Sequence, residues 1–150
     1  MAKLGTLRSV RSVQDPLHPL AFVDVTFFEL QVANKPGILG EIAGFLHKAH
    51  INIEAFNAGR DGLRILANDP DATRKVLAAH GVGYVEEEVI EIRLENKPGQ
   101  LAQVASALGR HGVNIITSFG AAGGADGGSI YVGVDDVEAA WEALEEVKGE

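Results

Sequence analysis

An internal repeat constrains this fold more than any other feature of the sequence. The tetrapeptide Asn-Lys-Pro-Gly at 34–37 recurs at 96–99, a shift of 62 residues. Between 34–53 and 96–115, nine of twenty aligned positions are identical, where unrelated segments would share about one. A duplication of this kind predicts two copies of one supersecondary unit.

The first half of each copy reads as strand, turn and helix. Apolar residues alternate with polar ones over 28–32 and 90–94, which is the period of a half-buried strand. The Asn-Lys-Pro-Gly turn ends each strand, and we expect its proline in the first helical turn and its asparagine as the helix cap. Apolar residues at helical spacing then predict a helix that ends near His50 or Gly112.

The second half of each copy adds two strands and a helix. Strands are expected to open at 51–53 and 113–115, and to follow at 63–67 and 129–134. Asp69, and Asp135 with Asp136, have the residue type that starts a helix. The second copy holds five extra residues, which we assign to a glycine-rich hairpin loop at Gly120–Gly128.

The last strand of the unit is present in the first copy only. Residues 82–87 form it and run almost directly into 89–94, so we expect one long strand with no hairpin. The second copy reaches Glu150 without such a strand, but residues 20–24 match 82–86 at the same shift. We therefore expect 20–25 to supply the missing edge strand, antiparallel to 89–94. The alternative is a bulged strand and an open sheet edge in the second copy.

These assignments give an α+β chain of two βαββαβ units with antiparallel sheets that exchange edge strands. The expected boundaries are an N-terminal segment at 1–19, a first unit at 20–87 and a second unit at 88–150. Residues 20–25 are counted with the first unit, although their strand completes the sheet of the second.

The stretches Phe28–Phe56 and Ile90–Phe119 resemble the ACT family. They share its pattern of apolar strand, Asn-x-Pro-Gly, amphipathic helix and a turn into an asparagine between two apolar residues. The resemblance covers about 130 residues and implies a ferredoxin-like fold. It also implies units paired side by side, with an amino acid bound between them.

The resemblance and the chemistry of the residues point to the same candidate site. The backbone at Gly37, Ile38 and Leu39, and at Gly99, Gln100 and Leu101, places amides at a helix start, where they favour an anion. The side chains of Asn34, Asn52, Asn96 and Asn114 can each donate and accept hydrogen bonds. Each of these asparagines is equally well explained as a capping or turn residue.

Serine-regulated phosphoglycerate dehydrogenases, which carry this motif, contact ligand through both asparagines of such a pair. The resemblance pairs Asn34 with Asn114 and Asn96 with Asn52, one from each unit. Those enzymes have a histidine two residues before the first asparagine, where this chain has Val32 and Leu94. A less polar amino acid than serine therefore fits equally well, and Gln100 opposite Ile38 makes the two sites unequal.

Other classes of function find little support. The net charge of −8 disfavours nucleic acid, and the absence of cysteine excludes disulfides and thiolate chemistry. His47 and His50 are three apart, but no further ligand completes a metal site. We expect no enzyme activity, no metal, no cofactor and no membrane association. We expect a cytoplasmic homo-oligomer, a homodimer in the simplest case.

The leading hypothesis is a regulatory protein whose association with a metabolic enzyme, or with itself, responds to an amino acid. The alternative is an interaction subunit that binds no ligand, similar to the small subunit of acetolactate synthase. The second half of that subunit is more divergent, whereas both copies here keep Asn-Lys-Pro-Gly intact.

Overall fold

The computed structural model describes residues 20–121, 124 and 126–149. The expected N-terminal segment 1–19 and part of the Gly120–Gly128 loop lie outside these residues. The chain divides into two compact units. The first unit is Thr26–Glu88, and the second is Val89–Glu150 together with Met1–Val25, of which residues 20–25 are described.

The first unit combines four strands with two helices. Its elements in chain order are the second half of β1 (Ala21–Leu30), α2 (Ile38–Lys48), β2 (Ile53–Gly59), β3 (Gly62–Ala67), α3 (Pro70–Ala79) and the first half of β4 (Tyr84–Leu94). The strand order is β2-β3-β1-β4, and β3 pairs antiparallel with both β1 and β2.

The second unit repeats this arrangement with strands from both ends of its sequence. It holds the second half of β4, α4 (Gln100–Arg110), β5 (Ile115–Ala121), β6 (Gly128–Val134), α5 (Val137–Gly149) and the first half of β1. The strand order is β1-β4-β6-β5. Both units are thus ferredoxin-like, and the expected α+β fold class is confirmed. A single strand, β4, also replaces any hairpin at 87–89.

Alternate residues of 20–25 are buried in the second unit. Leu20 and Phe22 are buried in one cluster with Ile90, Ile92 and Trp141. The rings of Phe22 and Trp141 meet edge-on with centroids 4.7 Å apart, and Trp141 Nε1 donates a 2.8 Å hydrogen bond to Asp24 Oδ1. The start of β1 is therefore held to α5 by ring packing and by a buried polar contact.

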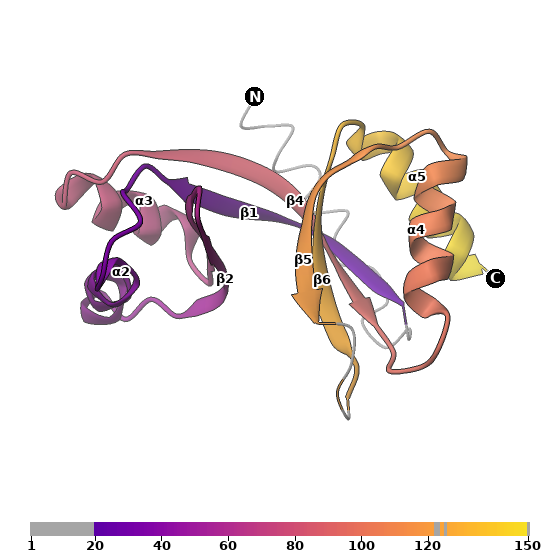
Figure 1. Cartoon of the computed structure of the whole chain (residues 1–150), viewed down its shortest axis with the longest axis horizontal. Coiled ribbons are helices and arrows are strands. Elements are labelled where there is room, and N and C mark those ends of the chain that lie inside the picture. Colours follow the sequence, from indigo (N-terminus) through magenta and orange to yellow (C-terminus); the bar gives the residue numbers. More distant parts are fainter. Residues whose placement is uncertain (1–19, 122–123, 125, 150) are drawn as a thin grey trace. The chain divides into compact units, whose positions relative to one another are not determined.

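The helices of each unit cover one face of its strands, as Figure 1 shows. In the first unit, Ile42 and Leu46 of α2 and Leu77 of α3 pack on Phe28 and Ile65. In the second, Val104 and Leu108 of α4 join Ala140 and Leu144 of α5. The apolar positions that recur at helical spacing in the sequence are the buried ones, because they form the stripe that faces the sheet.

The first helix of each unit begins differently from our expectation. Gly37 and Gly99 are the N-cap residues, in the left-handed region with φ of 87° and 89°, and neither helix has a side-chain cap. The proline lies before the helix and the asparagine does not cap it, so both assignments were wrong. Left-handed backbone strains any residue with a Cβ, which explains why glycine ends both copies of the tetrapeptide.

The second helix of each unit begins as expected. Asp69 caps α3 by accepting a 3.0 Å hydrogen bond from the Ala72 N–H. Asp136 Oδ1 accepts a 3.1 Å hydrogen bond from the Ala139 N–H at the start of α5. Aspartate in this position satisfies an amide that has no partner within the helix.

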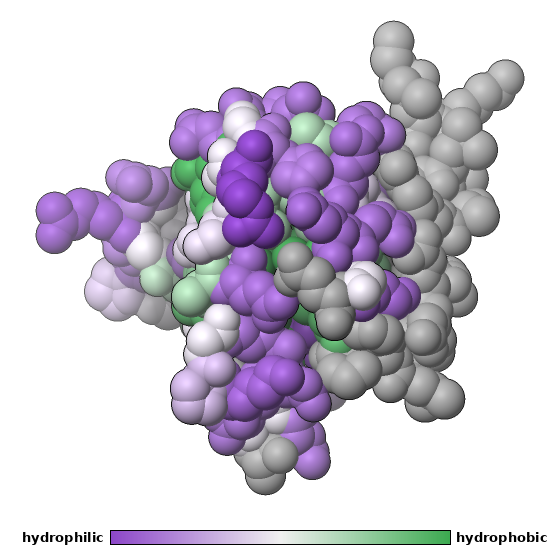
Figure 2. All heavy atoms as spheres, turned by 90° about the vertical axis from the view of Figure 1, so that its right-hand side faces the viewer, coloured by the Kyte–Doolittle hydropathy of each residue, from purple (hydrophilic) through white to green (hydrophobic). Residues whose placement is uncertain are grey.

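The face of the second unit seen in Figure 2 is mainly hydrophilic. Of its two helices, α5 carries five charged residues and α4 carries one, Arg110. Among the described residues, no helix has the length and apolar character needed to cross a membrane.

Candidate functional site

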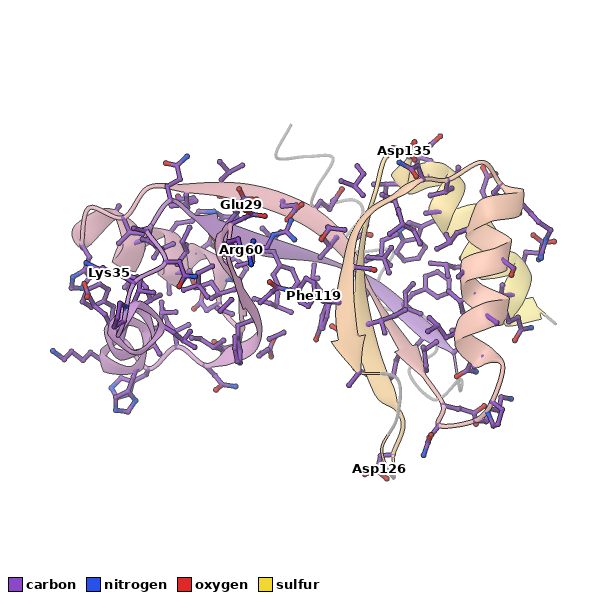
Figure 3. All side chains as sticks on the ribbon, in the orientation of Figure 1. Glu29, Lys35, Arg60, Phe119, Asp126 and Asp135 are labelled. Carbon is purple, nitrogen blue, oxygen red and sulfur yellow. The ribbon has the colours of Figure 1, made fainter. Side chains whose placement is uncertain are left out.

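The two Asn-Lys-Pro-Gly loops connect the first strand of each unit to its first helix. Lys35 marks the loop of the first unit in Figure 3. Asn34, Asn96, Gly37 and Gly99 are all exposed. The four-residue sequences are identical, so any difference between the loops comes from the residues around them.

The loop of the first unit borders a small hollow, which we call the first niche. Every residue that lines it belongs to the first unit: Val32, Ala33, Asn34, Ile38, Leu39, Ala58, Gly62 and Leu63. The centre of a water-sized sphere can move within about 20 Å³ of this hollow. This is room for about one water molecule or one methyl group. Asn34 provides the only side chain in this lining that forms strong hydrogen bonds.

Backbone donors belong to the lining of the first niche or, for Gly37, to the residue next to it in sequence. In the part of the first unit that the structure describes, the N–H groups of Ala33, Gly37 and Leu39 have no hydrogen-bond acceptor. Gly37 and Leu39 are at the start of α2, where amides have no helical partner and the helix dipole favours negative charge. The niche thus combines an apolar interior with an edge of amide donors and one carboxamide.

Asn52 and Asn114 lie at the other end of their units' first helices. The Asn52 N–H donates to Asn68 Oδ1 at 3.0 Å, and the Asn114 N–H donates to Asp135 Oδ1 at 2.9 Å. Both side chains are exposed. Helix α2 has 11 residues and is about 16 Å long, so Asn34 and Asn52 of the first unit do not share a site.

The corresponding loop of the second unit has different contacts. Gln100, at the position of Ile38, is buried, with 6% of its surface exposed, and its Oε1 accepts a hydrogen bond from the Glu95 N–H. In this loop the Lys97 N–H donates to the Glu95 carbonyl oxygen at 3.0 Å. In the loop of the first unit, the Ile38 N–H donates to the Lys35 carbonyl oxygen at 3.2 Å. Leu101 is 49% exposed.

The neighbouring hairpins also differ. Strand β4 pairs with β6 as far as Leu94 with Gly128, whereas the pairing of β1 with β3 ends at Leu30 with Leu63. A Cβ on Gly127 would collide with the carbonyl oxygen of Leu94. The five extra residues of the second copy therefore extend the strand pairing as far as Leu94, the position equivalent to Val32, and glycine permits this close approach.

Titratable groups with shifted pKa values lie away from the two loops in sequence and have structural partners. A bidentate hydrogen bond from Arg74, at 2.7 and 2.8 Å, lowers the pKa of Glu86. A hydrogen bond with His111 lowers the pKa of Glu146. His80 stacks on Phe45 with centroids 3.7 Å apart. Among the described residues no group of three or more metal-ligating side chains occurs, and His47 and His50 belong to none.

Sequence reasoning identified Asn34, Ile38 and Leu39 of the first niche but missed Ala33, Ala58, Gly62 and Leu63. These four are small or apolar residues without distinctive chemistry, and only the fold gathers them. One sequence signal indicated that the two loops have different surroundings: Ile38 in the first copy corresponds to Gln100 in the second. A buried glutamine requires a hydrogen-bond partner nearby, whereas an isoleucine does not.

Comparison with known protein families gives two matches along the chain. The model of the ACT domain matches residues 26–81 and again residues 89–140. The chain belongs to the ACT domain family. The two matches confirm the resemblance based on the repeated tetrapeptide, and no curated protein matches the sequence.

Two solved structures are similar to this chain over most of its length. The structure of protein BT0572 from Bacteroides thetaiotaomicron is 28% identical, with 87% of this chain and 90% of that chain covered and a TM-score of 0.70. The regulatory subunit of aspartate kinase from Thermus thermophilus is 15% identical, with 85% and 95% covered and a TM-score of 0.62.

A third similar structure belongs to a larger enzyme. Aspartokinase III of E. coli, solved in complex with aspartate and ADP, is 16% identical, with a TM-score of 0.60. The comparison covers 87% of this chain but 33% of the aspartokinase. At identities this low the similarity to the two aspartate kinase structures establishes the shared fold.

Proposed function

We propose that this protein is a regulatory amino-acid sensor whose ligand binds at the first niche, and that it catalyses no reaction. The observation that carries the proposal is the combination of an apolar hollow with unpaired amides and one carboxamide at its edge. Free amino acids carry the complementary groups, because they join an ammonium and a carboxylate to a side chain of variable polarity.

The contacts of the niche suggest how such a ligand is oriented. The carboxylate accepts from the Ala33 N–H and from the amides at the start of α2, where negative charge is favoured. The ammonium donates to the Asn34 side-chain oxygen. The side chain enters between Ile38 and Leu63, which offer no partner to a hydroxyl group.

The preferred ligand is therefore a small aliphatic amino acid such as valine, leucine or isoleucine. Serine would leave its hydroxyl group without a hydrogen bond in an apolar hollow, which costs about 1–3 kcal/mol. The niche has room for about one methyl group of such a side chain, and a further protein surface over it would complete the site.

The family resemblance pairs Asn34 with Asn114, and this pairing stays a prediction. Asn114→Ala would then weaken binding as much as Asn34→Ala, by about tenfold for one hydrogen bond to a charged group. Asn52→Ala is the matched control, because Asn52 is the same residue at the same place in the other copy, and it should leave affinity unchanged.

Equilibrium dialysis of the folded protein against each of the twenty amino acids tests the proposal. We expect retention of one or more aliphatic amino acids at millimolar concentration or below, with serine retained less. Failure to retain any amino acid at millimolar concentration would contradict the sensor function.

A ligand-free interaction subunit is the second candidate, favoured by exposed apolar side chains on edge strands. Phe56 on β2 is 54% exposed and Ile116 on β5 is 66% exposed. Both β2 and β5 are edge strands, at the two ends of the strand order. Stable association with a metabolic enzyme that is insensitive to every amino acid, and that Phe56→Glu abolishes, would favour this candidate.

A further inference from the structure

The buried carboxamide of Gln100 is the feature of the second unit that the proposed function leaves unexplained. Glutamine is seldom this deeply buried, and a buried amide needs hydrogen-bond partners. Here the partner is a backbone amide five residues earlier, Glu95 N–H, and the acceptor must be the side-chain oxygen because the backbone group is a donor.

Both ends of this contact correspond to walls of the first niche. Gln100 is the counterpart of Ile38, and Glu95 is the counterpart of Ala33, at the shift of 62 residues. Ile38 and Ala33 both line the first niche. The side chain of Gln100 therefore crosses the place in the second unit that corresponds to the hollow of the first.

The two amides at this place also have opposite hydrogen-bond states. The Glu95 N–H donates to Gln100, whereas within the described residues the Ala33 N–H has no acceptor. An isoleucine at position 38 has no oxygen to offer. The second unit thus provides from its own chain the acceptor that the first unit lacks.

We propose that Gln100 is a built-in occupant of the second unit's binding place, and that the chain consequently binds one amino acid, at the first unit. This rests on the proposed function for the ligand's identity, but the occupancy itself is a property of the chain alone. The carboxamide oxygen takes the role that the ligand carboxylate takes at Ala33. The residue at position 38 of the first copy, or at the equivalent position 100 of the second, then decides which copy can bind a ligand.

A reciprocal exchange of the two residues tests the occupancy without any ligand. In the wild type, hydrogen exchange followed by NMR should show the Glu95 amide protected at least about tenfold more than the Ala33 amide, since only the former is hydrogen-bonded. Gln100→Ile should remove this protection, and Ile38→Gln should confer it on Ala33. Equal protection of the two amides in the wild type would overturn the proposal.

The same variants test the consequence for binding. Isothermal titration with valine, leucine or isoleucine should give one site per chain for the wild type, two for Gln100→Ile, and at least tenfold weaker binding for Ile38→Gln. Two sites in the wild type would overturn the proposal, as would a single site in a Gln100→Ile variant whose Glu95 amide has lost protection.

The two arms separate this proposal from the proposed function. If no protein form binds an amino acid, the sensor function is lost, and the exchange measurement still decides whether Gln100 occupies the second unit. Urea unfolding of each variant provides the folding control, and Gln103→Leu, a change at an exposed position of the same helix, should leave the Glu95 amide protected and the stoichiometry at one.

Discussion

The first and second units have the same fold and the same tetrapeptide, but the surroundings of the two loops differ. The first has an open niche beside Ile38, whereas the second has Gln100 folded over the loop and a strand pair that extends farther. Duplication has preserved the backbone plan, including a strand irregularity at Ile53/Ala55 and again at Ile115/Thr117. The difference indicates that the motif sets the backbone of the loop. A neighbouring side chain then decides whether the space beside the loop is free for a ligand.

The helix ends offer a second comparison. Helix α2 is followed by His50 with φ of 59°, while α4 is followed by Gly112 with φ of 71°. In both, the next amide donates back to the helix, from Ile51 to Leu46 at 2.9 Å and from Val113 to Leu108 at 3.0 Å. The turn is the same in both units, but only the second has glycine there, which adopts a positive φ without strain.

The largest expected effect concerns the strand that completes the second unit. Phe22→Ala should reduce the free energy of unfolding by about 3–5 kcal/mol, because a buried aromatic ring leaves a cavity against Trp141. Hydrogen exchange should show the loss first in amides of α4 and α5. Phe28→Ala is the matched variant, with its loss first in α2 and α3. A cost below about 1 kcal/mol for Phe22→Ala would contradict this packing.

The next effect concerns the glycines before α2 and α4. Gly37→Ala and Gly99→Ala should each cost about 1–2 kcal/mol in urea unfolding, because both positions are left-handed. Gly40→Ala is the control, since Gly40 is inside α2 with open space around it, and it should stabilise by up to about 1 kcal/mol. If Gly37→Ala is neutral, the loop does not require this conformation.

Binding should separate the two loops. Asn34→Ala should weaken amino-acid affinity about tenfold, the effect of one lost hydrogen bond to a charged group. Asn96→Ala should leave affinity unchanged, because its loop belongs to the unit that Gln100 closes. Calorimetric titration checks both, and equal losses in the two variants would remove the distinction between the units.

The helix-end comparison predicts a smaller change. His50→Gly should raise the free energy of unfolding by about 1 kcal/mol, and Gly112→Ala should lower it by a similar amount. No atom lies within 4 Å of a Cβ placed on Gly112, so backbone strain is the only cost. A destabilised His50→Gly variant would show that the His50 side chain has a role of its own.

The smallest effect is in the acid range. Because Arg74 lowers the pKa of Glu86, their pair stabilises the first unit above the ordinary glutamate pKa, and this contribution disappears as the pH falls through the lowered value. The loss should stay below about 1 kcal/mol for a solvent-exposed pair. Glu86→Gln should reduce the change in unfolding free energy between pH 6 and pH 3, and an unaltered pH profile would contradict the pairing.

Much of the fold follows from patterns that the sequence displays directly. Alternation at 90–94, helical spacing at 101–108 and the aspartates before α3 and α5 each reflect a local preference, so they predict elements well. The match of 82–86 with 20–24 pointed to a strand at 20–25, because related copies need related sheets. The helix cap at Gly37 was missed, since asparagine and proline favour several turn geometries and the backbone chooses among them.

The candidate site was predictable only in part. Asn34, Ile38 and Leu39 belong to the recognisable loop, but Ala58 and Leu63 reach the niche through the register of β2 with β3, where they are partners. The hydrogen bond from the Glu95 N–H to Gln100 required coordinates, because sequence shows a polar residue at a buried position without showing which group it satisfies.

The central claim is that an amino acid binds at the loop of the first unit and not at the loop of the second. Its most direct test is an NMR titration of isotope-labelled protein with valine, leucine and isoleucine, following the amides of Ala33 and Glu95. We predict saturable shifts at Ala33, with Glu95 unchanged. Saturable shifts at Glu95, with or without shifts at Ala33, or no shift at either amide up to millimolar ligand, would contradict the account.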